Sequence, residues 1–360
     1  MRRWLVLFIL LGGGTSTVWP QQKPLAEGET LRINTALVTL NVGVSDKQGR
    51  ALTQLRAEDF AVYEDGRLQP IEFFGAEDQP ISFGLLLDRS QSMSDADKLT
   101  NAIEVAMAFL RAGNPQNDAF CLAFNEAPSL MADFTSDYSQ IGNRLVGLVG
   151  QGGTALYDAI LAGLDKLTTA KHRRRALIVI TDGRDEHSGY TLNDLLKRAQ
   201  AADVQIYIVG FFSPVEAEAY RAENALVTMM DGTQVDNPRL VFQSLAKETG
   251  AESFFPKTAA ELTRTVASIA ASLRRMYVLG YYPIRQERDD RYRRLEVKVR
   301  NVPASQIKTR QGYRLTESLP STSTVSSLPP DKKPAMADAV VGELDCDGWF
   351  HGMTNVTGLA

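Results

Sequence analysis

The chain has 360 residues and a net charge of −4, and 23% of its residues are charged while 44% are hydrophobic. This composition is typical of an ordinary globular protein with room for one large domain and a smaller one. The slight acidic excess gives no reason to expect nucleic acid as a partner.

The amino terminus has the pattern of an export signal. Arg2 and Arg3 precede an apolar run from Trp4 to Leu11, and small residues follow at 12–16. The apolar run is far shorter than the roughly 20 residues that span a bilayer. We therefore expect residues 1–20 to be a signal peptide, the mature protein to have no membrane span, and its location to be periplasmic or extracellular.

Strands and helices alternate along residues 81–275. Short apolar runs predict strands, and apolar residues at helical spacing lie between most of them. The alternation is typical of a doubly wound α/β domain with a mostly parallel, six-stranded sheet. Only a short turn separates two of the strands, which we therefore expect to be antiparallel. Five of the six expected strands are located by the sequence, at 83–87, 118–124, 130–134, 176–182 and 204–209.

The first of these strands ends in an Asp-x-Ser-x-Ser turn. Asp88, Ser90 and Ser92 place one carboxylate and two hydroxyls at the tip of a buried strand. Oxygen ligands of this kind are the ones that Mg²⁺ prefers. The alternative interpretation is a helix start, in which Ser92 or Ser94 caps the helix that follows.

Two further segments favour the metal site. Thr154 follows Gly152-Gly153 on a tight loop that opens a helix, and Asp182 ends a continuous β-branched run. Such a run is typical of a buried parallel strand. Ligands of open α/β sheets gather at the carboxyl ends of these strands. Thr154 and Asp182 are therefore candidates for a third hydroxyl and a second carboxylate.

In this order and at this spacing, the three loops resemble the metal-ion-dependent adhesion site of von Willebrand factor type A domains. The resemblance covers about residues 81–273. It implies that Mg²⁺ or Mn²⁺ binds there, that an Asp or Glu of a partner protein completes the coordination, and that the last helix, at 258–273, shifts in response. A type A fold whose site holds no metal is the alternative. The implied metal site consists of Asp88, Ser90, Ser92, Thr154 and Asp182.

The segments on either side of the α/β region have strand patterns. Residues 36–44 alternate between apolar and mostly polar or small side chains. Strands at 60–63 and 71–74 are expected to form a hairpin around Asp65-Gly66. Neither flank alone has enough strands for a stable sheet. We therefore predict that residues 31–80 and 277–315 together form a β-sandwich domain beside the α/β domain at 81–275.

The second flank carries the aromatic residues Tyr277, Tyr281 and Tyr282, which we expect in the core of the sandwich. Together with Arg310-Gln311-Gly312-Tyr313, this segment resembles the exported proteins related to von Willebrand factor type A that are described from acidobacteria. That resemblance runs from about residue 31 to residue 315.

Beyond the flanks, residues 316–360 are expected to form a disordered linker and tail, since 318–334 are rich in Ser, Thr and Pro. The only cysteines are Cys121, within an apolar strand, and Cys346, within the tail. We expect Cys121 to be buried and unpaired.

The sequence favours a binding protein over an enzyme. None of the three histidines lies in a nucleophile motif, and neither a Gly-x-Ser-x-Gly turn in the mature chain nor a phosphate-binding loop is present. The main hypothesis is an exported, metal-dependent adhesion module without catalytic residues. The first alternative is an envelope assembly or scaffold protein whose metal is only structural. A metal-dependent phosphotransferase is more remote, because it would need a carboxylate at Ser90 and a nearby lysine.

Overall fold

The computed structural model describes residues 37–315, apart from 49, 77–78, 95–97, 113, 222–223, 229–231 and 233. All described residues belong to one compact unit. The expected signal peptide at 1–20 and the expected tail at 316–360, including Cys346, lie outside the described residues.

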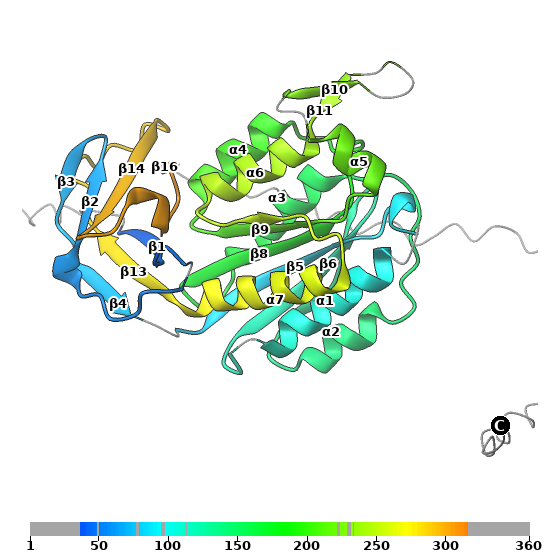
Figure 1. The fold of residues 1–360 in the computed structure, drawn as a ribbon, viewed down its shortest axis with the longest axis horizontal. Coiled ribbons are helices and arrows are strands. Elements are labelled where there is room, and N and C mark those ends of the chain that lie inside the picture. The colour runs from blue at the N-terminus through cyan, green and yellow to red at the C-terminus, as the bar shows by residue number, and fades with distance from the viewer. Residues whose placement is uncertain are drawn as a thin grey trace, which may run out of the picture. The chain divides into compact units, whose positions relative to one another are not determined.

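A six-stranded sheet forms the centre of the α/β part (Figure 1). Its strand order is β12-β9-β8-β5-β6-β7, and every neighbouring pair is parallel except β6 with β7. This confirms the predicted doubly wound, mostly parallel sheet. The strands are β5 (Ile81–Asp88), β6 (Asp118–Phe124), β7 (Pro128–Thr135), β8 (Arg174–Thr181), β9 (Gln205–Gly210) and β12 (Ser253–Phe254).

Helices cover both faces of this sheet, and each face has its own apolar core. On one face lie α1 (Lys98–Ala112), α2 (Tyr138–Leu145) and α7 (Ala259–Arg274). On the other lie α3 (Leu156–Leu167), α4 (Leu192–Ala201) and α6 (Pro238–Glu248). The central strand β5 is buried along its whole length, as a strand between two helical layers must be.

The long segment between β9 and α6 contains a short helix and a small hairpin. The helix α5 spans Pro214–Ala219, and the hairpin pairs β10 (Leu226–Thr228) with β11 (Gln234–Asp236). The segment leaves the carboxyl end of β9, so it begins at the same edge of the sheet as the candidate site.

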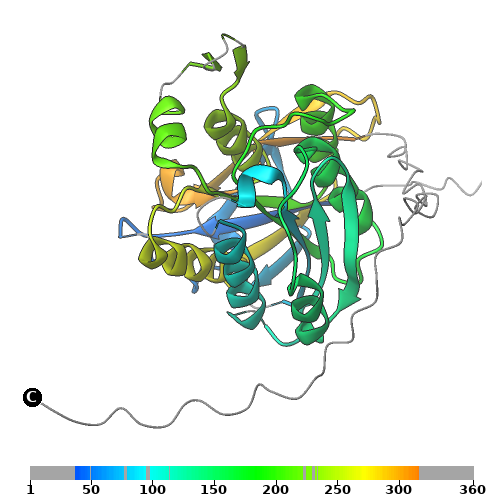
Figure 2. The same cartoon turned by 90° about the vertical axis from the view of Figure 1, so that its right-hand side faces the viewer.

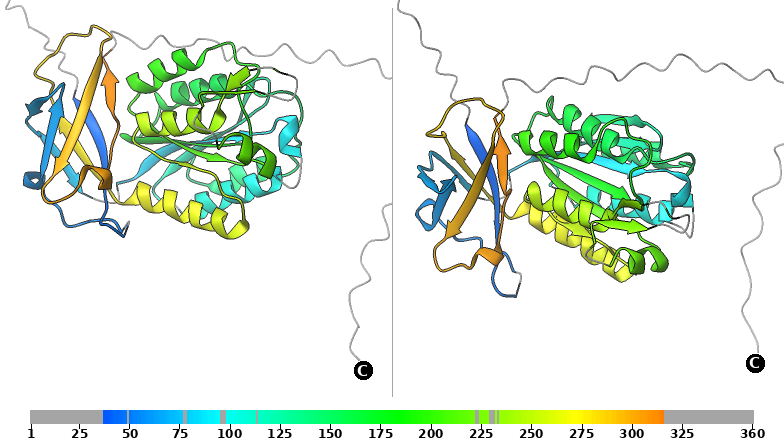
Figure 3. Two further views of the ribbon diagram at one scale, coloured as in Figure 1. Left: turned by 45° about the horizontal axis from the view of Figure 1, so that its top comes forward. Right: turned by 90° about the horizontal axis from the view of Figure 1, so that it is seen from above.

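The two flanks form a sandwich of two four-stranded sheets (Figure 3), which confirms the predicted architecture. One sheet has the order β15-β1-β13-β4 and the other β16-β14-β2-β3, so each sheet contains two strands from each flank. Their inner faces share one apolar cluster. The strands are β1 (Val38–Val44), β2 (Phe60–Glu64), β3 (Arg67–Gln69), β4 (Phe73–Ala76), β13 (Met276–Tyr281), β14 (Tyr292–Val299), β15 (Ile307–Lys308) and β16 (Gly312–Arg314).

Two details of the sandwich differ from the sequence prediction. Asp65 and Gly66 both have positive φ, as a two-residue hairpin turn requires, but the partner of β2 is β3 and not residues 71–74. Those residues cross to the other sheet, where β4 pairs with β13. Tyr277 and Tyr281 are buried as expected, whereas Tyr282 is 45% exposed because it lies just beyond the end of β13.

A buried carboxylate ties the two flanks together inside the sandwich. Glu64 of β2 accepts hydrogen bonds from the hydroxyls of Tyr281 (2.8 Å) and Tyr313 (2.6 Å). Arg293 of β14, fully buried, lies 3.4 Å from the same carboxylate. Burial raises the pKa of the Tyr281 hydroxyl, which keeps this donor protonated. The carboxylate is thus satisfied by groups of the chain itself.

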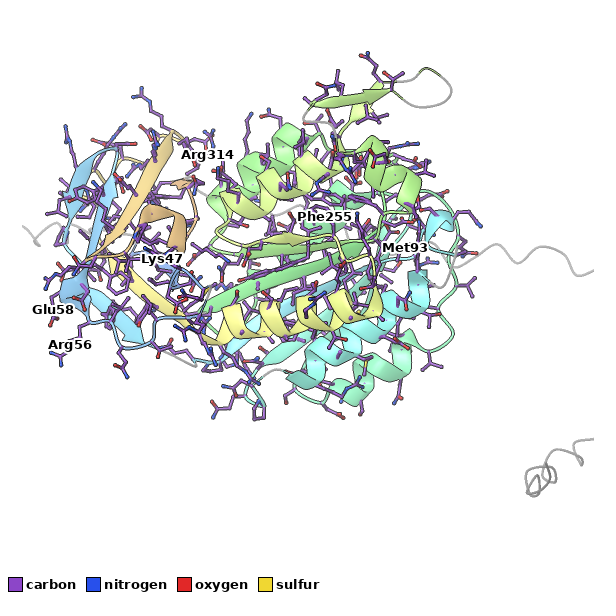
Figure 4. The ribbon with its side chains drawn as sticks, viewed as in Figure 1. Lys47, Arg56, Glu58, Met93, Phe255 and Arg314 are labelled. Atoms are coloured by element: carbon purple, nitrogen blue, oxygen red, sulfur yellow. The ribbon has the colours of Figure 1, made fainter. Side chains whose placement is uncertain are left out.

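Polar contacts join the sandwich to the helical layer. The Arg314 guanidinium (Figure 4) donates to the Gln200 side chain of α4 at 2.6 Å, and the Tyr292 hydroxyl donates to Glu248 of α6 at 2.5 Å. The helix α7 ends at Arg274 and β13 begins at Met276, so one residue connects the α/β part to the sandwich.

Cys121 lies in β6 and is buried, and it forms no disulfide within the described part of the chain. Burial raises the pKa of its thiol to about 12. The thiol is therefore protonated at neutral pH and serves as a small apolar group in the core.

Substitution of Leu40 tests the shared core of the sandwich. Leu40 of β1 is 0% exposed and pairs with Leu279 of β13, whereas Leu68 of β3 is 59% exposed. We expect Leu40→Ala to lower the free energy of unfolding by about 2–5 kcal/mol, measured by denaturant titration, because it leaves a cavity in the core. The control Leu68→Ala should change it by less than about 0.5 kcal/mol. Equal effects of the two substitutions would contradict the shared core.

Candidate metal centre

The candidate site lies where β5 and β8 end, at the edge of the sheet that faces the viewer in Figure 2. The two strands are parallel neighbours, and their pairing runs up to Leu87 opposite Ile180. Asp88 is the last residue of β5, and Asp182 directly follows β8. The parallel register therefore brings two carboxylates to one point of the edge. Both are nearly inaccessible to solvent.

Two hydrogen bonds fix the Asp88 carboxylate. One oxygen accepts from the backbone N–H of Ser90 at 2.8 Å, and the other accepts from the Thr181 hydroxyl at 2.6 Å. Thr181 is not among the site residues predicted from the sequence. Its position in the sequence, directly before Asp182 at the end of a predicted strand, could have identified it as a residue of the site.

The two serine hydroxyls connect the carboxylates. The hydroxyls of Ser90 and Ser92 lie 3.1 Å apart, and that of Ser92 donates to Asp182 at 2.8 Å. Both belong to the turn that enters the short 3₁₀ helix η2 (Gln91–Ser94). Met93, fully buried, anchors this helix to the core (Figure 4). The turn therefore presents its hydroxyls toward the strand ends.

The two serines considered as helix caps both donate to groups outside η2. Ser92 donates to Asp182, and the hydroxyl of Ser94 donates to the carbonyl of Gly150 at 2.9 Å. Both hydroxyls therefore connect η2 to other loops of the edge.

Thr154 reaches the same edge on the loop before α3. Its backbone carbonyl accepts from the N–H groups of Glu186 (2.8 Å) and His187 (3.0 Å), which join its loop to the one after β8. A Cβ atom at Gly183 would lie 3.9 Å from the Thr154 hydroxyl, so this hydroxyl lies beside the residue that follows Asp182. At Gly153 a Cβ atom would overlap the His187 ring at 2.1 Å, which explains the glycine. The Thr154 hydroxyl is thus placed beside the residue that follows the second carboxylate.

A lysine that sequence analysis did not identify completes the cluster. The Lys98 ammonium lies 2.5 Å from the Asp182 oxygen that Ser92 does not contact. It also lies 3.9 Å from the carboxylate of Glu216 in α5. The side chain is only 13% exposed. The sequence signal was a lysine shortly after the serine turn, at the start of the first predicted helix.

Burial dominates the electrostatics of the two carboxylates. It raises the pKa of Asp88 to about 6, although the hydrogen bonds from Thr181 and Ser90 oppose the increase. It also raises the pKa of Asp182, where Lys98 opposes it. Ionised carboxylates in such surroundings are costly unless a cation lies nearby.

The donor set fits a hard divalent cation. It consists of two carboxylates and the hydroxyls of Ser90, Ser92 and Thr154, all of which are oxygen ligands. Among the described residues, including those at this edge, no group of three His, Cys, Asp or Glu side chains could hold a metal ion. A metal site here would therefore depend on hydroxyls as well as carboxylates.

A cavity of about 410 Å³ lies at the same edge of the sheet, but none of the candidate metal ligands lines it. It is formed by the loop after β8, the start of α3, the strand β11 and the first turns of α6. Apolar and polar side chains both line it, among them Tyr157, Arg184, Tyr190, Leu226, Val235 and Phe242.

The match to one protein-family model agrees with the fold. Residues 84–184 match the sequence model of the von Willebrand factor type A domain, a span that contains all five candidate site residues. A search of curated proteins found no match.

Several solved structures resemble the chain at low identity. The conserved hypothetical protein BatB from Bacteroides thetaiotaomicron is 20% identical over 54% of this chain and 98% of its own, with a TM-score of 0.42. A von Willebrand factor type A protein from Catenulispora acidiphila is 13% identical over 72% of this chain and 74% of its own, with a TM-score of 0.43. The PilB minor pilin from Streptococcus sanguinis is 13% identical over 57% of this chain and 63% of its own, with a TM-score of 0.40.

The raised pKa of Asp88 predicts a pH dependence of stability in the presence of chelator. The pKa of Asp88 in the folded protein, about 6, exceeds the ordinary 3.8, so the protonated carboxyl stabilises the folded state. This contribution to the free energy of unfolding is fully present below about pH 4 and is lost as the pH rises through 6. The loss should amount to about 3 kcal/mol. Asp88→Asn should lack this part of the slope when the free energy of unfolding is measured from pH 4 to pH 7.

The control for this measurement is Asp133→Asn. Lys166 lowers the pKa of the Asp133 carboxyl, so its contribution to stability has the opposite sign and is lost as the pH falls. If Asp88→Asn and the wild type had the same slope, the Asp88 carboxylate would be solvated in the folded protein.

Proposed function

Because the chain carries a domain of the von Willebrand factor type A family, we propose that it is a protein-binding module of the adhesion type. Its partner would dock at the carboxyl edge of the six-stranded sheet. The proposed metal ligands are Asp88, Ser90, Ser92, Thr154 and Asp182. A Mg²⁺ or Mn²⁺ ion bound there would supply an open coordination position for a carboxylate of an Asp or Glu from the partner.

The observation that carries this proposal is the chain of contacts Asp88–Ser90–Ser92–Asp182 at one buried edge. Asp88 holds the serine turn through the Ser90 N–H, which orients both hydroxyls. Hydroxyls are neutral ligands, so they satisfy the coordination of a cation without cancelling its charge. That residual positive charge is what attracts an external carboxylate.

The surroundings of the site favour a protein as the ligand. The loop after β8, the helix α5 and the hairpin β10–β11 all project from the same edge, and Tyr190 and Leu226 on them are 44% and 49% exposed. With the cavity at the same edge, these groups offer a surface to the residues that flank the partner's carboxylate. We assign partner specificity to this surface. Aromatic and apolar contacts of this kind carry much of the energy of protein interfaces.

We further propose that the protein is exported and has no catalytic activity. Asp88 is fully buried and both its oxygens accept hydrogen bonds, so it is poorly placed to act as a nucleophile. Lys98 supplies the lysine that an aspartyl phosphotransferase would need, but Ser90 stands where the second carboxylate would be required. Among the described residues, no helix has the length and apolar composition needed to cross a membrane.

Calorimetry with Mn²⁺ tests the metal site. The wild type should bind one ion, and Asp88→Ala should weaken binding by about 10 to 100-fold, because the substitution removes a carboxylate and the group that orients the serine turn. Ser94→Ala is the matched control, since its hydroxyl lies in the same short helix but donates to the carbonyl of Gly150. Equal affinities of the wild type and Asp88→Ala would remove the metal from this location.

Capture of a partner from envelope extract separates the adhesion hypothesis from the scaffold alternative. With Mg²⁺ the immobilised wild type should retain a partner that chelator releases. Thr154→Ala should weaken retention of the partner more than it weakens Mn²⁺ binding, because the remaining four ligands still hold the ion. Retention that is equally strong in chelator would favour a scaffold whose metal is only structural.

A further inference from the structure

We propose that Lys98 is an internal competitor of the metal ion: its ammonium and the metal bind Asp182 as alternatives, and Glu216 receives the ammonium when the metal enters. This inference rests on the proposed metal site and adds a residue to it. It gives the chain its own means of setting how tightly the site holds a cation.

The contacts of Asp182 carry the argument. One carboxylate oxygen accepts from the Ser92 hydroxyl at 2.8 Å, and the other lies 2.5 Å from the Lys98 ammonium. Both oxygens are therefore engaged by the chain itself. A cation that approaches this carboxylate, directly or through water, has to share it with a group of the same charge.

The positive charge of Lys98 does not stabilise the helix that carries it. Lys98 is the first residue of α1, where the positive end of the helix dipole disfavours a cation. Its side chain is 13% exposed, so the ammonium has also lost most of its hydration. The pairing with Asp182 is what compensates both costs. The lysine therefore belongs to the site and not to the surface of the helix.

Glu216 offers the ammonium a second position. Its carboxylate lies 3.9 Å from the Lys98 ammonium, and 34% of the side chain is exposed. The same carboxylate accepts from the backbone N–H of Ser213 at 2.8 Å, which holds it at the start of α5. A small movement of the lysine thus transfers its charge from the site to α5. Since α5 lies on the proposed docking surface, occupancy of the site would change the charge that a partner meets there.

Calorimetry with Mn²⁺ on Lys98→Met tests the competition. We expect Mn²⁺ affinity to increase about 10 to 100-fold over the wild type, the range typical of groups that tune a metal ligand. In chelator the variant should have a lower melting temperature, since Asp182 loses its counter-charge, and Mn²⁺ should raise that temperature more than in the wild type. Lys166→Met is the control, because it removes a lysine paired with Asp133 away from the site.

A double-mutant cycle tests the second position. Glu216→Gln should weaken Mn²⁺ binding in the wild type, because the displaced ammonium loses its acceptor, and it should have no effect in the Lys98→Met background. If Lys98→Met does not fold, Lys98→Gln serves in its place, since a neutral amide can still donate to Asp182.

The outcomes separate this inference from the metal site itself. Unchanged or weaker Mn²⁺ binding by Lys98→Met would overturn the competition while leaving the site in place. Binding by Lys98→Met but not by the wild type would support the competition and show that the lysine keeps the native site closed to metal. Absence of binding by both would overturn the proposed metal site and the inference with it.

Discussion

The structure is governed by the parallel pairing of β5 and β8, which forces two carboxylates together at a buried edge. Asp88 and Asp182 end neighbouring strands in the middle of the sheet, so neither can turn away into solvent. Their mutual repulsion and loss of hydration have to be offset by hydrogen-bond donors or cations. The serine turn, Thr181 and Lys98 all converge here for that reason. The arrangement is a concentration of negative charge that the fold itself only partly neutralises.

The sandwich also contains a buried carboxylate, but this one is fully paired with groups of the chain itself. Glu64 of the first flank has two tyrosine hydroxyls and a buried arginine around it, and these three groups come from the second flank. Its requirements are met entirely within the molecule, so it serves to specify which strands pack together. At the edge of the α/β sheet, by contrast, hydrogen-bond donors and one lysine surround two carboxylates, and we propose that an external cation supplies further positive charge. Comparison of the two environments separates a carboxylate used for architecture from one suited to binding.

Sequence patterns predicted the strands and helices that local periodicity marks. They did not predict contacts between residues that lie far apart in the chain. The buried strands ending at Asp88 and Asp182 were evident because continuous apolar runs mark central parallel strands. The helix α6 was missed although Asn237-Pro238, a cap followed by proline, marks its start. Lys98 could not be assigned, since its contact with Asp182 spans 84 positions of the chain. The exchange of strands between the two sheets likewise depends on pairing that no local pattern encodes.

Only one residue separates α7 from β13, so the sandwich holds the carboxyl end of the last helix in place. β13 pairs with β1 over six residues on one side and with β4 over four on the other. A strand held on both sides can slide only in steps of two residues, about 7 Å, if its buried side chains are to stay buried. The helix shift that the family resemblance implies is therefore resisted by two ladders of hydrogen bonds. Tension applied through a bound partner would instead be borne as shear between β1 and β13, the geometry in which backbone hydrogen bonds are loaded together.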